Sequence, residues 1–401
     1  MPCHQRRLLM SPHARNVSLL ATAQALLLTN GVMLVAMNGL VGLRLAPTAW
    51  LVTLPLTTYV LGAAIASLPA AFFMKHHGRR AGFMLGASLG CAGAVLSYFA
   101  VSAGNFWLLC SGTVLAGIYN AFGQQYRFAA ADSAPPQWRA RAISLTLAGG
   151  IAGGVIGPAV GNLTRNLLTP SFVASYLALA GFALLAMLIA SRVDIPPLAA
   201  EQQHAAGRPV RELMRNPKLL VAVLAAACGY GVMNLLMTAT ALAMDSCGLP
   251  FGDAALVLEW HVIGMFAPSF FTAHLLKRFG IPRMLLTGAA LMTLCIVIAL
   301  SGVTLMHFWW ALLLLGIGWN FLFIGGTTLL TEVCRPEERA KVQGGNDFLV
   351  LGVQALTSLT SGAMFTGSGW IALNFIALPL VAATAIGTLL YMRHVRRSPV
   401  G

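Results

Sequence analysis

The sequence predicts an all-α integral membrane protein with twelve transmembrane helices, arranged as two six-helix bundles related by pseudo-symmetry. Composition, the length of the apolar runs and the placement of the basic residues predict this fold class. Of the 401 residues, 58% are hydrophobic and only 9% are charged, whereas soluble proteins carry about a quarter charged residues. Apolar runs of about 20 residues, long enough to cross a ~30 Å hydrocarbon core, recur along the chain.

The polar connections between the apolar runs are short, with one exception. Residues 192–217 form a longer polar segment with prolines, which separates six spans from six spans. We therefore expect an N-terminal bundle over residues 1–191, a cytoplasmic linker over 192–217 and a C-terminal bundle over 218–401. The expected spans are 17–41, 47–73, 82–102, 106–126, 142–164, 172–191, 218–242, 254–276, 282–302, 307–331, 346–366 and 370–391.

The basic residues predict the orientation of these spans. If the N-terminus is inside, all of the 25 Lys and Arg residues except Arg44 and Arg165 fall on the cytoplasmic side. The net charge of +14 invites a nucleic-acid interpretation, but the basic residues stand in short clusters between apolar runs, so no nucleic-acid partner is expected. Short loops and a compact chain favour a multi-pass protein of the bacterial inner membrane with both termini in the cytoplasm.

Cysteine spacing and sequence motifs argue against enzymes and bound metals. The seven cysteines form no CxxC pair, and most lie inside apolar runs, which is typical of small buried hydrophobic residues. The sequence contains no GxxxxGK[ST], no His/Glu zinc signature and no GxSxG elbow. We therefore expect no cofactor, no metal, no ATP-driven step and no enzymatic activity.

An internal repeat at an offset of about 200 residues supports the two-bundle organisation. Residues 118–141, IYNAFGQQYRFAAADSAPPQWRAR, align with 318–341, GWNFLFIGGTTLLTEVCRPEERAK. KHHGRRAGFMLG at 75–86 aligns with KRFGIPRMLLTG at 277–288. The matched pairs are Asn120 with Asn320, Asp132 with Glu332, Pro136 with Pro336, Arg139 with Arg339, Arg141 with Lys341, Lys75 with Lys277, Gly78 with Gly280, and Gly86 with Gly288.

Parallel six-span repeats are a transporter architecture with a substrate site between the halves, and the whole chain resembles the major facilitator superfamily. GRRAG at 78–82, between the second and third spans, is similar to the end of that family's loop signature, G-x-x-x-D-R-x-G-R-R. The matching residues are Gly78, Arg79 and Arg80. The departures are Ala71, Lys75 and His76, where the signature has glycine, aspartate and arginine.

In the family, the signature aspartate secures the inward gate against the start of span 11. Asp347 stands at that start, so a pair of Lys75 with Asp347 would make the same contact with its charges exchanged. The alternative is that both side chains lie in water at the membrane surface, where an exposed pair contributes less than ~1 kcal/mol. Arg79 with Asp132 is a second candidate gate pair.

The fifth span carries the stretch GGIAGGVIGPAVG at 149–161. In lipid, small residues at four-residue spacing let two helix backbones approach closely, and a proline bends a helix. The stretch is similar to the family's signature G-x-x-x-G-P-x-x-G, although Asn162 replaces a common final glycine. The resemblance implies an antiporter that exports its substrate, and the alternative is a generic packing face. The matching gate residues are Gly153, Gly157, Pro158 and Gly161.

Polar side chains are costly inside hydrocarbon, so their distribution predicts the substrate cavity. Amides concentrate in spans 1, 4, 7 and 10, and the resemblance implies that these spans line the cavity. For each amide the alternative is a hydrogen bond between helices. We expect no well-buried Lys or Arg there, with Arg44 and Arg127 near span ends. The expected substrate-binding residues are Asn30, Asn38, Asn120, Gln124, Tyr230, Asn234 and Asn320.

One acidic residue, Glu259, is expected well inside a span, roughly 9 Å inward of Asp253. A carboxylate there suits proton binding, and a structural hydrogen bond is the alternative. His261 follows about 200° around the helix, so the two cannot both face the cavity. We name Glu259 and His261 as proton-coupling candidates, with packing or gating as the alternative for His261.

These observations predict a secondary active transporter that moves a small neutral or weakly cationic organic solute by alternating access. The main expectation is proton-coupled efflux by a monomer whose partners are the lipid bilayer, the solute and the proton. The alternative is an uptake symporter or facilitator for a small metabolite or vitamin. A substrate sensor that does not transport is a third reading, and it would bind labelled substrate in proteoliposomes without moving it.

Overall fold

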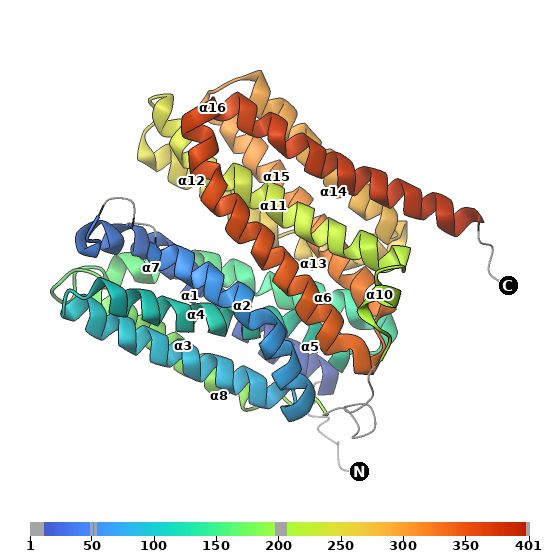
Figure 1. The fold of residues 1–401 in the computed structure, drawn as a ribbon, viewed down its shortest axis with the longest axis horizontal. Coiled ribbons are helices and arrows are strands. Elements are labelled where there is room, and N and C mark those ends of the chain that lie inside the picture. The colour runs from blue at the N-terminus through green and yellow to red at the C-terminus, as the bar shows by residue number, and fades with distance from the viewer. Residues whose placement is uncertain (1–11, 49–50, 52–53, 197–206, 398–401) are drawn as a thin grey trace, which may run out of the picture.

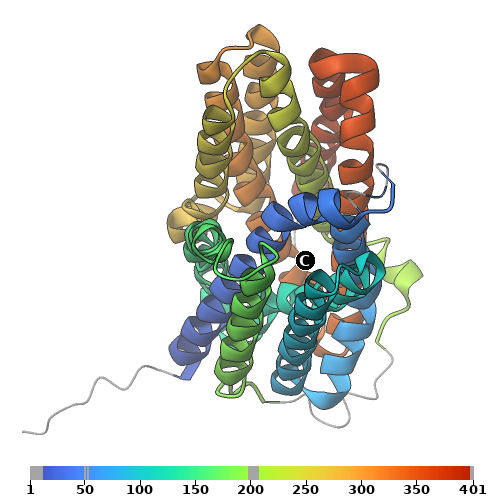
Figure 2. The same ribbon diagram turned by 90° about the vertical axis from the view of Figure 1, so that its left-hand side faces the viewer.

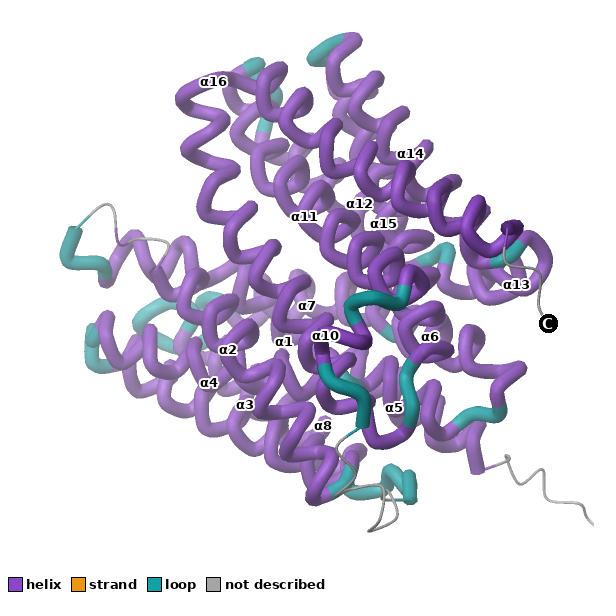
Figure 3. Tube along the Cα trace, turned by 45° about the vertical axis from the view of Figure 1, so that its right-hand side comes forward, coloured by secondary structure: helices purple, strands orange, loops and turns teal. Residues whose placement is uncertain are grey.

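The computed structural model describes residues 12–48, 51, 54–196 and 207–397. Across these ranges helices are the only regular secondary structure (Figure 3). Arg6, Arg7 and residues 197–206 of the expected linker lie outside the described residues. The first half contains α1 (Pro12–Leu45), α2 (Leu54–His77), α3 (Arg79–Ser102), α4 (Phe106–Gln124), α5 (Tyr126–Ser133), η2 (Pro136–Trp138), α6 (Arg139–Ala148), α7 (Gly150–Thr164) and α8 (Val173–Ala190). The second half contains α10 (Val210–Leu213), α11 (Pro217–Ser246), α12 (Phe251–Phe266), α13 (Ser269–Phe279), α14 (Ile281–Ser301), α15 (Leu305–Val333), η3 (Pro336–Glu338) and α16 (Arg339–Arg397).

The helices supply the membrane crossings that the sequence predicts. Ten segments of the described chain are long and apolar enough to span a bilayer, and the bent pair of α12 and α13 makes an eleventh. The helix α16 is two helices joined at Gly369, where φ is 76°, and its first arm covers the predicted span 346–366. The predicted all-α membrane fold is confirmed.

Three of the crossings are interrupted by a break within their length. The break between α4 and α5 falls at Gln125, and the break between α6 and α7 falls at Gly149. The helices α12 and α13 meet at 45° around Pro268, whose ring removes a backbone donor. The helix α7 continues through Pro158. Discontinuous spans are tolerated where neighbouring helices satisfy the freed backbone groups.

The helices form two bundles, α1 to α8 and α11 to α16, which lie side by side in both views (Figures 1 and 2). The predicted repeat is visible in the backbone. Gly78 has φ 85° and ψ 160°, and its match Gly280 has φ 84° and ψ 150°. The 3-10 turns η2 and η3 begin at the matched prolines, Pro136 and Pro336. The pseudo-symmetry of the two bundles is therefore confirmed.

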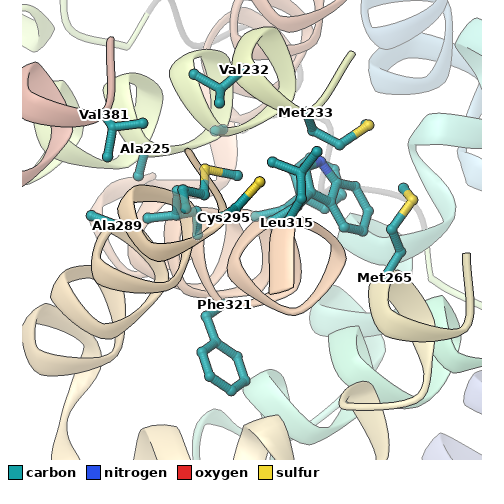
Figure 4. Close-up of a cluster of buried hydrophobic side chains, with 14 of the residues drawn as sticks. Ala225, Val232, Met233, Met265, Ala289, Cys295, Leu315, Phe321 and Val381 are labelled. Carbon is teal, nitrogen blue, oxygen red and sulfur yellow. The ribbon is translucent and has the colours of Figure 1, made fainter. Parts of the chain in front are cut away.

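Both bundles have large side chains in their cores and glycines where helices approach closely. In the C-terminal bundle, Met265, Leu315 and Cys295 belong to one buried cluster among α11, α12, α14 and α15 (Figure 4). In the N-terminal bundle, α1 and α7 meet through glycines. A Cβ on Gly153 would lie 2.5 Å from Ala25 O and one on Gly157 3.2 Å from Thr29 O. This is the close backbone packing expected of the span-5 stretch.

The bundles converge at one end, which we call the linker end because α2 ends, α3 begins and α10 lies there (Figure 1). The helix α2 packs along the first arm of α16, and α6 packs on α13 and α15. At Gly344 the approach is so close that a Cβ would meet Ala71 Cβ at 2.8 Å. Farther from the linker end, α7 touches α12 through Gly150 and Gly154, against Phe266 and Val262.

Candidate functional site

A network of charged side chains closes the linker end between the two bundles. Asp132 at the end of α5 accepts from Arg79 of α3 at 2.9 Å and from Arg339 of α16 at 3.1 Å. Arg79 also donates to Gln343 of α16 at 2.7 Å. The structure thus forms the predicted pair of Arg79 with Asp132. Arg339 and Gln343, which the sequence analysis did not select as site residues, extend this network to the second bundle. That Arg79 and Asp132 gate transport stays a prediction.

The other predicted gate residues lie around this network. Lys75 lines a pocket at the linker end together with Gly78, Arg79, Asp132 and Arg339. Arg80 is exposed on α3. Gly78 supplies the positive φ that lets α3 start directly after α2.

A second ion pair lies deeper between the bundles. Arg127 of α5 donates to Asp347 Oδ1 of α16, and the two side chains are only 2% and 1% exposed. Gln125 donates to the other carboxylate oxygen at 2.7 Å. The ion pair of Asp347 in this structure is therefore made with Arg127. The expectation that no basic residue is well buried is wrong for Arg127. Its burial is tolerable because Asp347 and the residue next to the helix break at Gln125 supply its hydrogen-bond partners.

The guanidinium of Arg127 also contacts aromatic rings from both bundles. Its Cζ lies 4.5 Å from the ring centroid of Phe128 and 4.6 Å from that of Phe323. Phe323 stacks on Trp319 at 4.9 Å, and Tyr230 of α11 meets both rings edge-on at 5.2 Å. The C-terminal bundle therefore presents an aromatic surface to the charged pair, a geometry that favours a planar or cationic group.

Two of the predicted substrate residues join this centre from α4. Asn120 and Gln124 are half-buried, and Gln124 Nε2 donates to Asn120 Oδ1 at 3.3 Å. Gln124 Oε1 accepts from Arg127 at 2.7 Å. The structure therefore brings together Asn120, Gln124 and Tyr230 at the boundary between the bundles, beside Arg127.

The other predicted substrate residues hold helices together inside one bundle. Asn320 is fully buried, where it accepts from Thr272 and donates to Met265 O and Ser269 Oγ, all at 2.7 Å. Asn38 accepts from Tyr176 at 2.8 Å. Asn234 donates to Gln354 O and Thr357 at 3.1 Å. Asn30 donates to Leu26 O at 3.2 Å and lines a small pocket of the N-terminal bundle. The contacts of Asn320, Asn38 and Asn234 match the alternative of a hydrogen bond between helices, whereas the bond of Asn30 lies within α1. Substrate binding by these four stays a prediction.

The proton-coupling candidates lie on different faces of α12, as their spacing predicts. Glu259 is exposed, and its neighbour Trp260 is 39% exposed. His261 is fully buried, and its Nδ1 lies 2.8 Å from Leu312 O of α15. This contact fits the packing alternative for His261. A role of either residue in proton coupling stays a prediction.

Arg208 of the linker is clamped to the segment between α15 and α16. Arg208 donates from Nε and Nη2 to the two carboxylate oxygens of Glu338, both at 2.7 Å, and its backbone N–H adds a third bond. Lys341 in turn donates to Arg208 O at 2.7 Å. Hydrogen bonds from Arg208 lower the pKa of Glu338 to about 2. No sequence pattern links residues 130 positions apart, so this clamp is visible only in the structure.

Two pseudo-symmetric helical bundles that meet around polar side chains and close at one end define a membrane transporter. Residues 18–350 match the sequence profile of the Major Facilitator Superfamily, and the chain belongs to this family. It is a transporter and not an enzyme. The family membership that the sequence motifs predict is thereby confirmed.

Relatives with the same architecture are found among sequences and structures. The riboflavin transporter RfnT of Brucella anthropi is 40% identical, over 94% of this chain and 96% of that protein. The uncharacterized transporter YdeG of Bacillus subtilis is 29% identical, over 85% of this chain and 84% of that protein. FucP in an outward conformation superimposes with a TM-score of 0.77 at 17% identity, over 94% and 99% of the two chains. The proton:xylose symporter XylE gives 0.77 at 15% identity, over 95% of each. The two structural matches show the fold alone.

Proposed function

We propose that this transporter carries riboflavin, or a closely related flavin, into the cell. The observation that carries the proposal is the 40% identity, along 94% of the chain, with a riboflavin transporter. This similarity favours the alternative expectation, uptake of a small metabolite or vitamin, over the main expectation of proton-coupled efflux.

The chemistry at the boundary between the bundles supports a flavin. Riboflavin is an uncharged molecule with a flat three-ring system and a polyhydroxylated chain. The half-buried ring of Tyr230, which packs on the buried rings of Trp319 and Phe323, offers flat apolar surface, and the amides of Asn120 and Gln124 offer both donors and acceptors. The charges of Arg127 and Asp347 already neutralise each other, which suits a substrate without net charge.

The proposal includes a placement in the membrane. We place the linker end in the cytoplasm of a bacterial cell, with the division at residues 192–217, because the basic residues gather on that side. The structure would then be closed towards the cytoplasm. Reporter fusions after residues 77, 103 and 191 test the placement, and it fails if the fusion after residue 103 is cytoplasmic.

Growth of a riboflavin-auxotrophic bacterium that lacks its own riboflavin carrier tests the function. We expect the chain to restore growth at low external riboflavin and to accelerate uptake of labelled riboflavin. Tyr230→Ala should raise the KM for uptake about tenfold by removing the edge-on ring, while Tyr176→Phe, which alters a contact within one bundle, should not. Growth no better than the empty vector would refute flavin uptake, and faster loss of preloaded riboflavin would indicate efflux.

A further inference from the structure

A continuous chain of polar contacts runs from the half-buried side chains of α4 to the ion pair that joins the two bundles. Asn120 accepts from Gln124 at 3.3 Å, Gln124 accepts from Arg127 at 2.7 Å, and Arg127 donates to Asp347 of α16. The first two members are half-buried and the last two are almost completely buried. The chain therefore leads from a surface that a solute can reach to a contact that it cannot reach.

The orientation of Arg127 depends on Gln124. Nη1 of Arg127 donates twice to this residue, to the side-chain Oε1 at 2.7 Å and to the backbone O at 2.9 Å. Nη2 is thereby directed at Asp347, while Nε has no hydrogen-bond partner. A buried guanidinium with an unsatisfied donor is poised to exchange partners, because each unmade bond of a charged group is costly.

The helix break at Gln125 places these groups together. The helix α4 ends at Gln124 and α5 begins at Tyr126, so consecutive residues serve different neighbours. Gln124 faces Asn120 and Arg127, while Gln125 donates to Asp347 and accepts from Arg79 at 3.0 Å. A change at Gln124 therefore acts on a segment that also contacts Asp347 and Arg79.

We propose that Asn120, Gln124, Arg127 and Asp347 form a relay that transmits substrate occupancy to the closed linker end. The proposal rests on the proposed function for the identity of the substrate. A solute that hydrogen-bonds the amide of Gln124 competes with Arg127 for Oε1. The guanidinium then loses the contact that directs it at Asp347, and the two bundles are held together less tightly. Gln124 contacts substrate, and Arg127 is a positioning residue.

Distance measurements between spin labels on the two bundles test the relay. The labels replace exposed residues of the linker end, His76 on α2 and Lys277 on α13, in a background without the seven native cysteines that still transports. Without substrate, we expect Gln124→Met to raise the ratio of the longer to the shorter distance about tenfold, the effect of one bond to a charged group. Asn120→Ala gives a second, smaller shift. Tyr176→Phe, which removes the bond to Asn38 within one bundle, should match the wild type.

In the second part of this experiment, riboflavin is added before the distances are measured. It should shift the wild-type distances towards the longer population but leave Gln124→Met unchanged. The relay is refuted if Gln124→Met and Asn120→Ala match the wild type without substrate, or if riboflavin shifts Gln124→Met as far as the wild type. If the substrate-free shifts appear while riboflavin moves no wild-type distance, the relay stands and riboflavin is the wrong substrate.

Discussion

The helix pair α4–α5 and the helix α15 occupy matched places in the two copies, about 200 residues apart, but their polar side chains do different things. Asn120 is half-buried and has Gln124 as its side-chain partner, whereas Asn320 is fully buried with three partners on α12 and α13. The positions of Gln124 and Arg127 are matched by Ile324 and Thr327. The N-terminal copy therefore carries the polar relay, whereas the matched segment of the C-terminal copy is packed against its own helices.

The backbones of the two segments differ in the same sense. The helix α15 runs without interruption for 29 residues, and its aromatic residues Trp319 and Phe323 are almost fully buried. The pair α4–α5 is broken at Gln125, where two adjacent amides and an arginine stand at the positions of Ile324, Gly325 and Thr327. The duplication kept the scaffold, while the capacity to respond to a solute concentrates in one copy.

The largest difference between the copies should appear at Arg127 and its match Thr327. Arg127→Met leaves Asp347 buried without its ion partner, which costs about 3–5 kcal/mol, whereas Thr327→Val should cost less than about 1 kcal/mol because its hydroxyl has no partner. Thermal unfolding in detergent measures both. The double variant Arg127→Met, Asp347→Leu should recover most of the stability but not transport. Equal costs at the two positions would contradict the comparison.

Substitutions at the two matched asparagines should change different properties: stability at Asn320 and the KM for transport at Asn120. Asn320→Leu removes the hydrogen bonds to Ser269, Thr272 and Met265 O at once, so we expect a loss of about 2–3 kcal/mol in the free energy of unfolding and an unchanged KM for riboflavin. Asn120→Ala should cost less than about 1 kcal/mol but raise the KM about tenfold. A raised KM for Asn320→Leu with normal stability would assign substrate binding to both copies.

A smaller loss of stability is expected along α7, which belongs to the N-terminal copy. Gly153→Ala places a methyl group 2.5 Å from Ala25 O, so we expect a loss of about 1–3 kcal/mol and slower transport. Gly161→Ala places it 3.9 Å from Met33 and should change stability by less than about 0.5 kcal/mol. Melting temperatures and uptake rates of the two variants check this. Equal tolerance would show that α1 and α7 do not need close contact.

A pH-dependent effect is expected at the clamp of Arg208 on Glu338. The bound Glu338 has a pKa of about 2, below the usual glutamate value of about 4.3, so the clamp contributes its full stability above that usual value and loses it as the pH falls towards 2. The stability difference between wild type and Glu338→Gln should be constant from about pH 8 to pH 5 and shrink below it. A control is Glu332→Gln, whose exposed pair with Lys218 should matter by less than about 1 kcal/mol. A difference that peaks below pH 4 would contradict the clamp.

The fold could be predicted because its causes are local. The apolar runs long enough to cross a bilayer, the basic residues between them and the turns at Gly78 and Gly280 each depend on residues that are close together in the sequence. The break at Gln125 could not be predicted, because it depends on packing against neighbouring helices.

The site was predicted only in part. Asn120, Gln124 and Arg127 are separated by four and three residues, a spacing that predicts one shared helix face. The ion pair of Arg127 with Asp347 joins positions 220 residues apart, and the sequence offers several basic candidates for one carboxylate. Asn320 looked equivalent to Asn120 because the sequence shows the repeat but not which face of α15 is buried.

Riboflavin uptake into proteoliposomes that contain Gln124→Met or Ile324→Met tests the account most directly, since the same residue enters both copies at matched positions. We expect saturable uptake by the wild type, a loss of at least about tenfold for Gln124→Met, and a change of less than about twofold for the buried, volume-conserving Ile324→Met. Equal losses for the two variants, or wild-type uptake no faster than in protein-free liposomes, would contradict it.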